Sequence, residues 1–287
     1  MIERQRERFA ALDPMLPAPP PPPDGDVLTA ATADGERLLA VHRTVRHAPG
    51  STELLWSPAV LHQLYPYPGG AGLDPLLRAW RAHLRDERPD SGCLVVWPSR
   101  DVGAARDLLA HGLLPLSVLA VRSPAPGQGS TGVTVRRVGP GDRDTVAELA
   151  TATFDYTGQV GAPRHPDTPT LVRCSLDGGG PRWLAERDGR AVGLADCAWT
   201  DVPEGSDLLP VGRWFYVNTV GTTPDSRGTG VGRALMAAAH DHAAAGGATG
   251  CHLYYNPANP LAPAFWHRQG YRPLWTLWEV RPASALR

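Results

Sequence analysis

The sequence lacks several features that mark special classes of protein. Its 287 residues contain no apolar run long enough to cross a bilayer, and the segment after Met1 is charged, unlike a secretory signal. The formal net charge is −1, so we expect no strong attraction to nucleic acid or to an anionic membrane. The composition therefore predicts a cytoplasmic globular protein, and it leaves the oligomeric state open.

Cysteine is scarce, and its spacing excludes two further classes. The four cysteines are far apart, at Cys93, Cys174, Cys197 and Cys251. They indicate reduced thiols rather than a disulfide framework or a zinc site. His240 and His242 lie two residues apart in an expected helix and so point to different faces. We therefore predict no metal site.

Two segments rich in turn-forming residues divide the chain. Five prolines at 19–23 favour extended polyproline II, as a stiff connector or alternatively as a partner-binding segment. Residues 123–132 contain turn formers without apolar periodicity. We predict an N-terminal helix and proline-rich segment over 1–25, a first domain over 26–122, a linker over 123–132 and a second domain over 133–287.

The two sides of this linker share an ungapped internal repeat. GCLVVWPSRDVGAARDLLAHGLLPL from Gly92 aligns with GCHLYYNPANPLAPAFWHRQGYRPL from Gly250, an offset of 250 − 92 = 158 residues. The same offset pairs Gly72 with Gly230. Because matches occur at turn-forming positions, the sequence predicts a duplicated fold.

The repeated unit reads strand, loop, helix, strand, helix, strand. In the second copy we expect these elements at 213–222, 231–245, 251–256, 260–269 and 271–280. Upstream, we expect a strand at 133–138, a helix at 142–154 and a hairpin at 183–199 that turns at Asp188-Gly189. This order predicts an α/β (α+β) fold with a mixed sheet.

The stretch PDSRGTGVGRAL, residues 224–235, joins an expected strand to an expected helix. Its alternating glycines allow backbone N–H groups to approach a ligand, and the helix start adds free N–H groups and a positive dipole end. Arg227 adds a charge suited to phosphate oxygens. The spacing fits neither a dinucleotide GxGxxG nor a P-loop. It indicates a diphosphate cradle, with a surface turn as the alternative.

The loop also resembles a known family. Arg227-Gly-Thr-Gly-Val-Gly232 matches the Arg/Gln-x-x-Gly-x-Gly/Ala pattern of the GNAT superfamily of N-acetyltransferases. Pro224 and the sequence FWHRQGY resemble the same family, over most of 133–280. The resemblance implies tandem GNAT-like domains, each a mixed, mostly antiparallel sheet flanked by helices. It also implies acetyl-CoA as cosubstrate.

The resemblance further implies which residues bind acetyl-CoA. The pyrophosphate is expected on Arg227, Gly228, Thr229, Gly230, Val231 and Gly232. The pantetheine arm is expected between splayed strands near Cys251, on the backbone of Val220, Gly221 and Thr222. Asn259 matches the family's asparagine at the start of the next helix.

The first copy has GGAGLD, from Gly69 to Asp74, where the second has RGTGVG. The arginine is absent, and a carboxylate stands at the helix start, where we expect Asp74 to cap the helix. We therefore predict a degenerate first domain without a cofactor site.

The catalytic groups are less clearly marked. Many family members have a proton-donating tyrosine where this chain has Trp266, and protein-lysine members have a glutamate base where it has Tyr216. Tyr216 is a candidate for proton transfer or a pocket-wall aromatic, on one strand face with Asn218 and Val220. Asp196 is a candidate base or ammonium ligand, with a surface aspartate as the alternative.

These observations predict an acetyl-CoA-dependent N-acetyltransferase that transfers acetyl to a primary amine of a small molecule by direct attack. The alternatives are a non-catalytic acyl-CoA-binding module and an acyl-CoA enzyme of other chemistry. Asp201, Glu204 and Asp207 would attract a cationic amine, unless they form an ordinary solvated loop.

Overall fold

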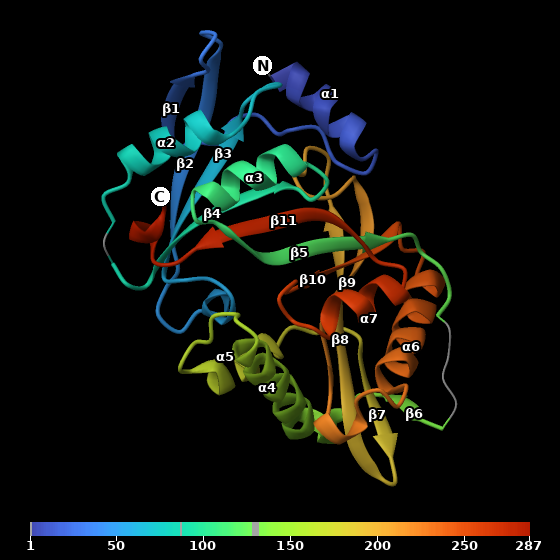
Figure 1. The fold of residues 1–287 in the computed structure, drawn as a ribbon. Coiled ribbons are helices and arrows are strands. Elements are labelled where there is room, and N and C mark those ends of the chain that lie inside the picture. The colour runs from blue at the N-terminus through green and yellow to red at the C-terminus, as the bar shows by residue number, and fades with distance from the viewer. Residues whose placement is uncertain (1, 87, 128–131) are drawn as a thin grey trace. The chain divides into compact units, whose positions relative to one another are not determined.

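The computed structural model describes residues 2–86, 88–127 and 132–287 (Figure 1). The chain forms two compact units. Unit 1 comprises Met1–Leu119, Pro203–Val211 and Pro273–Arg287, and unit 2 comprises Ala120–Val202 and Gly212–Arg272.

The helices are α1 Ile2–Leu12, α2 Asp74–His83, α3 Val102–Ala110, α4 Arg143–Gln159, α5 Thr168–Ser175, α6 Val231–Ala245 and α7 Ala262–Arg268. The strands are β1 Asp26–Ala31, β2 Arg37–Arg46, β3 Val60–Tyr67, β4 Ser91–Pro98, β5 Leu114–Arg122, β6 Thr134–Arg137, β7 Arg182–Arg187, β8 Arg190–Val202, β9 Gly212–Thr222, β10 Gly250–Tyr255 and β11 Arg272–Val280.

Unit 1 is a mixed sheet with helices packed on it. Its strand order is β1-β2-β3-β4-β11, in which β3 and β4 are parallel and the other neighbours antiparallel. The amphipathic helix α2 buries Leu76, Leu77 and Trp80 completely, and α3 does the same with Leu108. These side chains form the core between helices and sheet.

Unit 2 has the strand order β10-β9-β8-β7-β6, with β9 and β10 parallel and the others antiparallel. A Cβ on Gly193 of β8 would lie 2.8 Å from Val231 of α6, and one on Gly221 of β9 would lie 2.0 Å from Thr153 of α4. Gly221 pairs with Leu194, the neighbour of Gly193, so the two glycines face opposite ways. Helices α4 and α6 therefore cover opposite faces of these strands (Figure 1).

The expected elements of the second copy are present, and the predicted α/β (α+β) class, with a mostly antiparallel sheet flanked by helices, is confirmed. Helix α6 has the predicted bounds, and the hairpin turns at Asp188 and Gly189, whose φ angles are 50° and 72°. Helix α5 was not predicted.

The repeat offset recurs in the structure. Strands β5 and β11 each have nine residues and begin 272 − 114 = 158 residues apart. The helix before each of them, α3 or α7, and the parallel strand pair before that helix also correspond. This correspondence supports the tandem arrangement, which stays a prediction.

The two units are not consecutive in sequence. Residues 203–211 and 273–287, which fall within the expected second domain, belong to unit 1. Of the expected linker, residues 128–131 lie outside the described part of the chain. Residues 120–122 of the expected first domain belong in turn to unit 2, and the four-part division stays a prediction.

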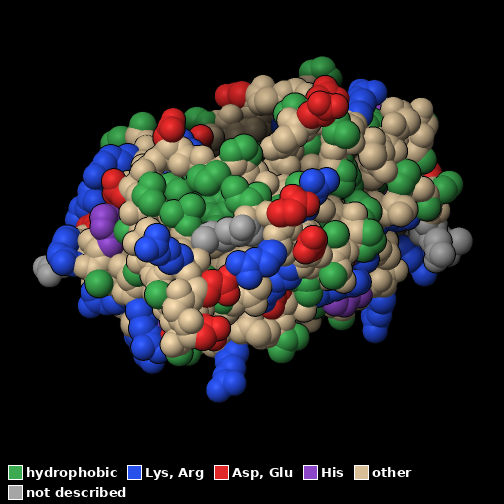
Figure 2. Space-filling model, turned by 90° about the horizontal axis from the view of Figure 1, so that it is seen from above, with side chains coloured by type: hydrophobic (Ala, Val, Ile, Leu, Met, Phe, Trp, Pro, Cys, Tyr) green, Lys and Arg blue, Asp and Glu red, His purple; other side chains and the backbone are tan. Residues whose placement is uncertain are grey.

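The surface carries charges of both signs, and the cysteines are unpaired. Basic side chains, all of them arginine, and acidic side chains are interspersed on the face seen in Figure 2. All four cysteines are free thiols, and only Cys174 is exposed. Among the helices of the described residues, none is long and apolar enough to cross a membrane.

Candidate functional site

The glycine-rich loop lies between β9 and α6 in unit 2. Gly228 and Gly230 have φ angles of +73° and +90°, a conformation that favours glycine. Thr229 donates a hydrogen bond from its hydroxyl to the carbonyl oxygen of Ser226, at 2.7 Å, and accepts one from Arg187 Nη2, at 3.1 Å. The loop is thus an ordered turn that leads directly into α6.

The first turn of α6 offers hydrogen-bond donors at this loop. No side chain of the described residues caps the helix, which starts at Val231 after Gly230. The first N–H groups of a helix have no partner within it, and the positive end of its dipole lies there. The exposed Arg227 is held with its guanidinium carbon 4.2 Å from the Tyr156 ring centroid. The arrangement fits an anion with several oxygens, such as a diphosphate.

The corresponding turn in unit 1 already holds an anion. Asp107 Oδ2 accepts hydrogen bonds from the backbone nitrogens of Leu73, at 2.7 Å, and Asp74, at 3.3 Å. The prediction that Asp74 caps α2 is therefore wrong. Its carboxylate instead binds Arg78, at 2.6 Å, and His111, at 3.0 Å. A carboxylate from α3 thus occupies the donors at the start of α2.

In unit 2 an apolar ring stands at the position of that carboxylate. Phe265 of α7 corresponds to Asp107, since 265 − 107 = 158. A Cβ on Gly232, in the first turn of α6, would lie 3.2 Å from the Phe265 ring, and a Cβ on Gly72, just before α2, would lie 2.8 Å from Asp107 Oδ2. In unit 1 the chain itself therefore supplies a negative charge at the helix start, and in unit 2 the corresponding residue is uncharged.

Backbone groups at the end of β9 point away from β8. The nitrogen of Thr223 donates to the carbonyl of Val192 at 2.9 Å, in register with the Thr222–Gly193 pair. In antiparallel pairs the hydrogen bonds alternate, so the N–H and C=O groups of Thr222 and Val220 face the opposite side. The pairing of β9 with β10 extends from Trp214 to Val217. Val220 and Thr222 thus present backbone groups beyond that pairing, as the resemblance implies for pantetheine.

A β-bulge lies just before this segment. Asp196 pairs with Thr219 and Cys197 with Val217, so Asn218 is the extra residue of β9. Side chains therefore stop alternating between the two faces of β9 at Asn218. The prediction that Tyr216, Asn218 and Val220 share one face assumed such alternation, so it no longer follows.

Asp196 is buried beside the bulge and has two polar partners. Its side chain is 5% exposed, so the alternative of a surface aspartate is wrong. Arg182 Nε donates to Oδ1 at 2.5 Å, and Asn218 Nδ2 donates to Oδ2 at 2.7 Å. Because both oxygens accept hydrogen bonds and one forms an ion pair, the geometry favours a role in orienting Asn218. Its role as a base stays a prediction.

Tyr216 belongs to an aromatic cluster between β9 and β10. Its ring stacks on His252, with centroids 4.8 Å apart and planes at 14°, and meets Tyr254 edge-on at 6.2 Å. Burial raises the pKa of Tyr216 and lowers that of His252 to about 4. Both side chains are therefore neutral at pH 7, and Tyr216 can donate a hydrogen bond but is a weak acid.

Trp266, at the position of the family's usual tyrosine, is buried in α7. Its ring meets Tyr271 edge-on at 5.5 Å, and Tyr271 shares a 3.0 Å hydrogen bond with His240 Nε2. Burial, followed by the charge of Arg122, lowers the pKa of His240 to about 3. Trp266 and its neighbours thus form a packed cluster.

Asn259 lies before α7, and its Oδ1 accepts from the nitrogen of Leu261 at 3.0 Å.

The three acidic residues of the expected loop are exposed. Asp201 belongs to unit 2, whereas Glu204 and Asp207 belong to unit 1, where the charge of Asp207 adds to burial in raising the pKa of Tyr65. Their attraction for a cationic amine stays a prediction.

Known proteins resemble this chain both in its fold and in its glycine-rich loop. The family model described as an acetyltransferase (GNAT) domain matches residues 179–273, which contain the glycine loop, α6 and α7. Mycothiol acetyltransferase of Thermobispora bispora is 29% identical over 290 residues, covering 86% of this chain and 94% of that protein. Residues 179–273 of this chain thus match a GNAT acetyltransferase domain. The predicted family and enzyme class are therefore confirmed.

Other GNAT relatives match in part or in fold. Mycothiol acetyltransferase of Streptomyces griseus is 34% identical over 148 residues, so the match spans 49% of this chain and 43% of that protein. A GCN5-related N-acetyltransferase from Sphaerobacter thermophilus has the same fold, with a TM-score of 0.54 and 20% identity over 88% of this chain and 80% of that one.

Two residues of this GNAT site were not predicted. Arg182 pairs with Asp196 because a bulge between Ala185 and Glu186 shifts the hairpin register. The turn alone, with Arg187 opposite Arg190, would have placed residue 182 opposite 195. His252 is the other, and only its place on the strand beside Tyr216 could have indicated it.

Proposed function

We propose that this GNAT protein transfers an acetyl group from acetyl-CoA to a primary amine of a small molecule. The observation that carries the proposal is the uncapped start of α6, with Gly228 and Gly230 in left-handed conformations and Arg227 exposed beside them. A helix start of this kind binds phosphate oxygens through its N–H groups and dipole. The resemblance to GNAT enzymes implies acetyl-CoA, whose diphosphate is such an anion.

The proposed cofactor site extends from this loop to β9. Residues 227–232 would hold the diphosphate, and the backbone groups of Val220, Gly221 and Thr222 would line the pantetheine arm. Of these, Val220 and Thr222 face away from β8 and can bond to a ligand, whereas Gly221 pairs with Leu194. Gly221 contributes differently, because its lack of a Cβ allows α4 to approach β9. Asn259 would fix the turn that starts α7.

The chemistry requires a neutral amine and a leaving thiolate. The amine nitrogen attacks the thioester carbonyl carbon, the C–S bond breaks, and the ammonium proton must leave. A backbone N–H near Val220 would stabilise the charge that develops on the carbonyl oxygen. Tyr216 keeps its proton at neutral pH and is our candidate to donate a hydrogen bond to the thiolate, which takes up its proton from water, while Asp196 would hold Asn218 in place. Trp266 carries no acidic proton and would only pack.

A small acceptor is supported by the relatives and by the charge. The curated relatives are named mycothiol acetyltransferases, and mycothiol is a small molecule. The net charge of −1 offers no strong attraction for a phosphate backbone or a basic protein tail. We therefore propose the amine that those enzymes acetylate, or one of similar size, as the acceptor.

The test is CoA release from acetyl-CoA with a panel of acceptors: the mycothiol acetyltransferase substrate, amino acids, aminoglycosides, polyamines and lysine peptides. The chain contains no lysine, so acetylation of its own lysines cannot contribute to the signal. We expect turnover with a small amine, and a raised KM for acetyl-CoA in Arg227→Ala but not in Arg268→Ala, an exposed arginine on α7. Preference for a lysine peptide over every small amine would refute the acceptor class.

The same assay addresses the second candidate, a non-catalytic acyl-CoA-binding module. Trp266 favours it, because this buried ring replaces the usual proton donor. Tight CoA binding without turnover on any acceptor would support that function instead.

A further inference from the structure

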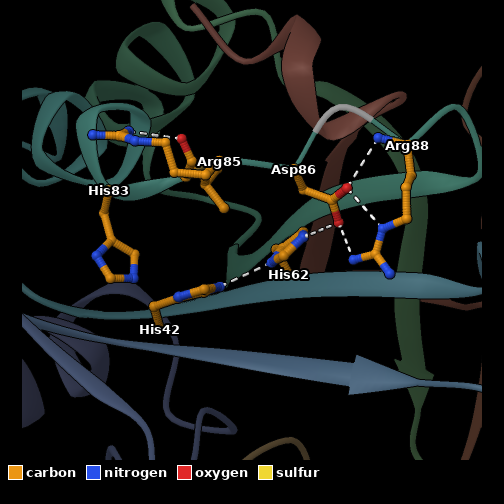
Figure 3. Close-up of a pocket in the computed structure, with 7 residues that line it drawn as sticks. His42, His62, His83, Arg85, Asp86 and Arg88 are labelled. Carbon is orange, nitrogen blue, oxygen red and sulfur yellow. Dashed lines mark hydrogen bonds and ion pairs between the residues drawn. The ribbon is translucent and has the colours of Figure 1, made fainter.

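A cluster of histidines and carboxylates lies in unit 1, away from the glycine loop in sequence. His42, His62, His83 and Asp86 line a cavity of about 370 Å³, which also contacts Arg85 and Arg88 (Figure 3). Asp26, at the start of β1, lies beside two of the histidines. The residues come from β1, β2, β3 and the end of α2.

A chain of polar contacts orients the His42 ring. Hydrogen bonds from Arg88 hold the pKa of Asp86 well below its usual range, so Asp86 is a carboxylate that can only accept. His62 Nε2, 2.8 Å away, therefore donates to it. The other nitrogen of His62, Nδ1, lies 3.0 Å from His42 Nε2, and the Thr44 hydroxyl lies within 3.4 Å of both nitrogens. His42 Nε2 therefore has polar partners on this side, and Nδ1 points to the other side.

His42 Nδ1 faces a carboxylate. His42 is 5% exposed, and its Nδ1 is buried without a hydrogen-bond partner among the described residues. The nearest polar atom recorded for it is Asp26 Oδ2, at 3.5 Å. The same carboxylate oxygen lies 3.2 Å from His83 Nε2. A proton on Nδ1 or a metal ion between the two atoms would complete this contact.

We propose that His42 Nδ1, His83 Nε2 and the Asp26 carboxylate bind one Zn²⁺ ion, with His62 and Asp86 as positioning residues. The three ligand atoms lie within 4.8 Å of one another. Zn–N and Zn–O bonds of about 2.0–2.1 Å in a tetrahedron place ligand atoms about 3.3 Å apart. Two of the three separations, 3.5 Å and 3.2 Å, are already close to this value.

The surroundings of His42 match those of a metal ligand. A histidine that binds a metal commonly donates its other N–H to an acceptor, which fixes the ring and raises its basicity. The His42–His62–Asp86 chain provides this. The side chains of Asp26 and His83 are 66% and 37% exposed, so an ion can enter, and water can take the fourth position. The bound ion would tie the end of α2 to β1 and β2.

The first experiment titrates ZnCl₂ into the full-length protein, purified without a histidine tag and stripped with a chelator, by calorimetry. We expect one zinc per chain and a higher melting temperature with zinc. X-ray absorption should report nitrogen and oxygen ligands, including two imidazoles. No stoichiometric binding, or a spectrum with a sulfur ligand such as the exposed Cys174, would overturn the proposal.

Variants assign the ligands. Asp26→Asn and His83→Ala change exposed side chains and should fold, and each should weaken zinc binding at least tenfold. Asp34→Asn, an exposed carboxylate just after β1, is the matched control and should bind as the wild type does. His62→Gln should weaken binding about 10- to 100-fold but leave both imidazoles in the spectrum. Wild-type affinity in both ligand variants would overturn the assignment.

Discussion

Replacing Phe265 by aspartate should close the proposed diphosphate site. The change reproduces in unit 2 the contact that Asp107 makes in unit 1, where one carboxylate oxygen accepts from two backbone nitrogens at 2.7 and 3.3 Å. Phe265 lies against Gly232, the second residue of α6, so an aspartate at 265 would stand beside the first turn of that helix. An internal anion would then compete with the diphosphate.

The magnitude follows from the hydrogen bonds that CoA would have to displace. A hydrogen bond to a charged group is worth about 1.5–3 kcal/mol. Displacing one such bond from the helix start should weaken CoA binding about 10- to 150-fold, because 1.4 kcal/mol corresponds to a factor of ten. Repulsion between the carboxylate and the diphosphate adds to this loss, and salt should reduce that added part.

Isothermal titration of CoA into Phe265→Asp and Phe265→Asn separates charge from packing. Both variants lose the edge contact of the ring with Trp266, 4.8 Å between centroids, so any cost in stability is shared. Only the aspartate carries the charge. Equal CoA affinity in the two variants would refute the reasoning, even if both bind more weakly than the wild type.

Three further predictions test other parts of unit 2. CoA should bind once per chain, and Arg227→Ala should lose about 1.5–3 kcal/mol of binding, whereas two sites by calorimetry would contradict this. Trp266→Phe should keep turnover within about tenfold, since the ring only packs, and abolished turnover in a folded variant that binds CoA would show otherwise. His252 has a pKa of about 4 when folded, against 6.5 in the unfolded chain, so the unfolded state takes up the proton first and stability falls as the pH drops below 6.5. Denaturant unfolding at pH 7 and pH 5 should show that His252→Phe removes about 2 kcal/mol of this loss, and an unchanged pH dependence would contradict it.

Local sequence signals predicted much of unit 2. The helix α6 has the predicted bounds because a glycine loop and Gly246 delimit an alanine-rich segment of high helix propensity. The hairpin turn at Asp188 and Gly189 follows from residues that tolerate positive φ. Both features depend on neighbours in the sequence, so the sequence alone was sufficient.

Features that depend on distant contacts were missed. The bulge at Asn218 is a property of two paired strands, and the capping of α2 by Asp107 requires that α3 be placed first. The cluster around His42 combines residues from three strands and a helix end, with no motif spacing in sequence. The prediction of no metal site uses only the cysteines and the pair His240 and His242, so it does not address this cluster.

The membership of β11 in unit 1 has a consequence for biosynthesis. Its antiparallel partner β4 ends at Pro98, whereas β11 begins at Arg272, with nearly all of unit 2 made between them. Until the ribosome has made β11, the nascent first repeat carries β4 as an exposed edge of apolar residues, the kind of edge that pairs with other chains. Such long-range pairing also slows folding. A chain released after residue 132 should therefore aggregate or need a chaperone, and β11 supplied as a separate peptide should restore a soluble unit.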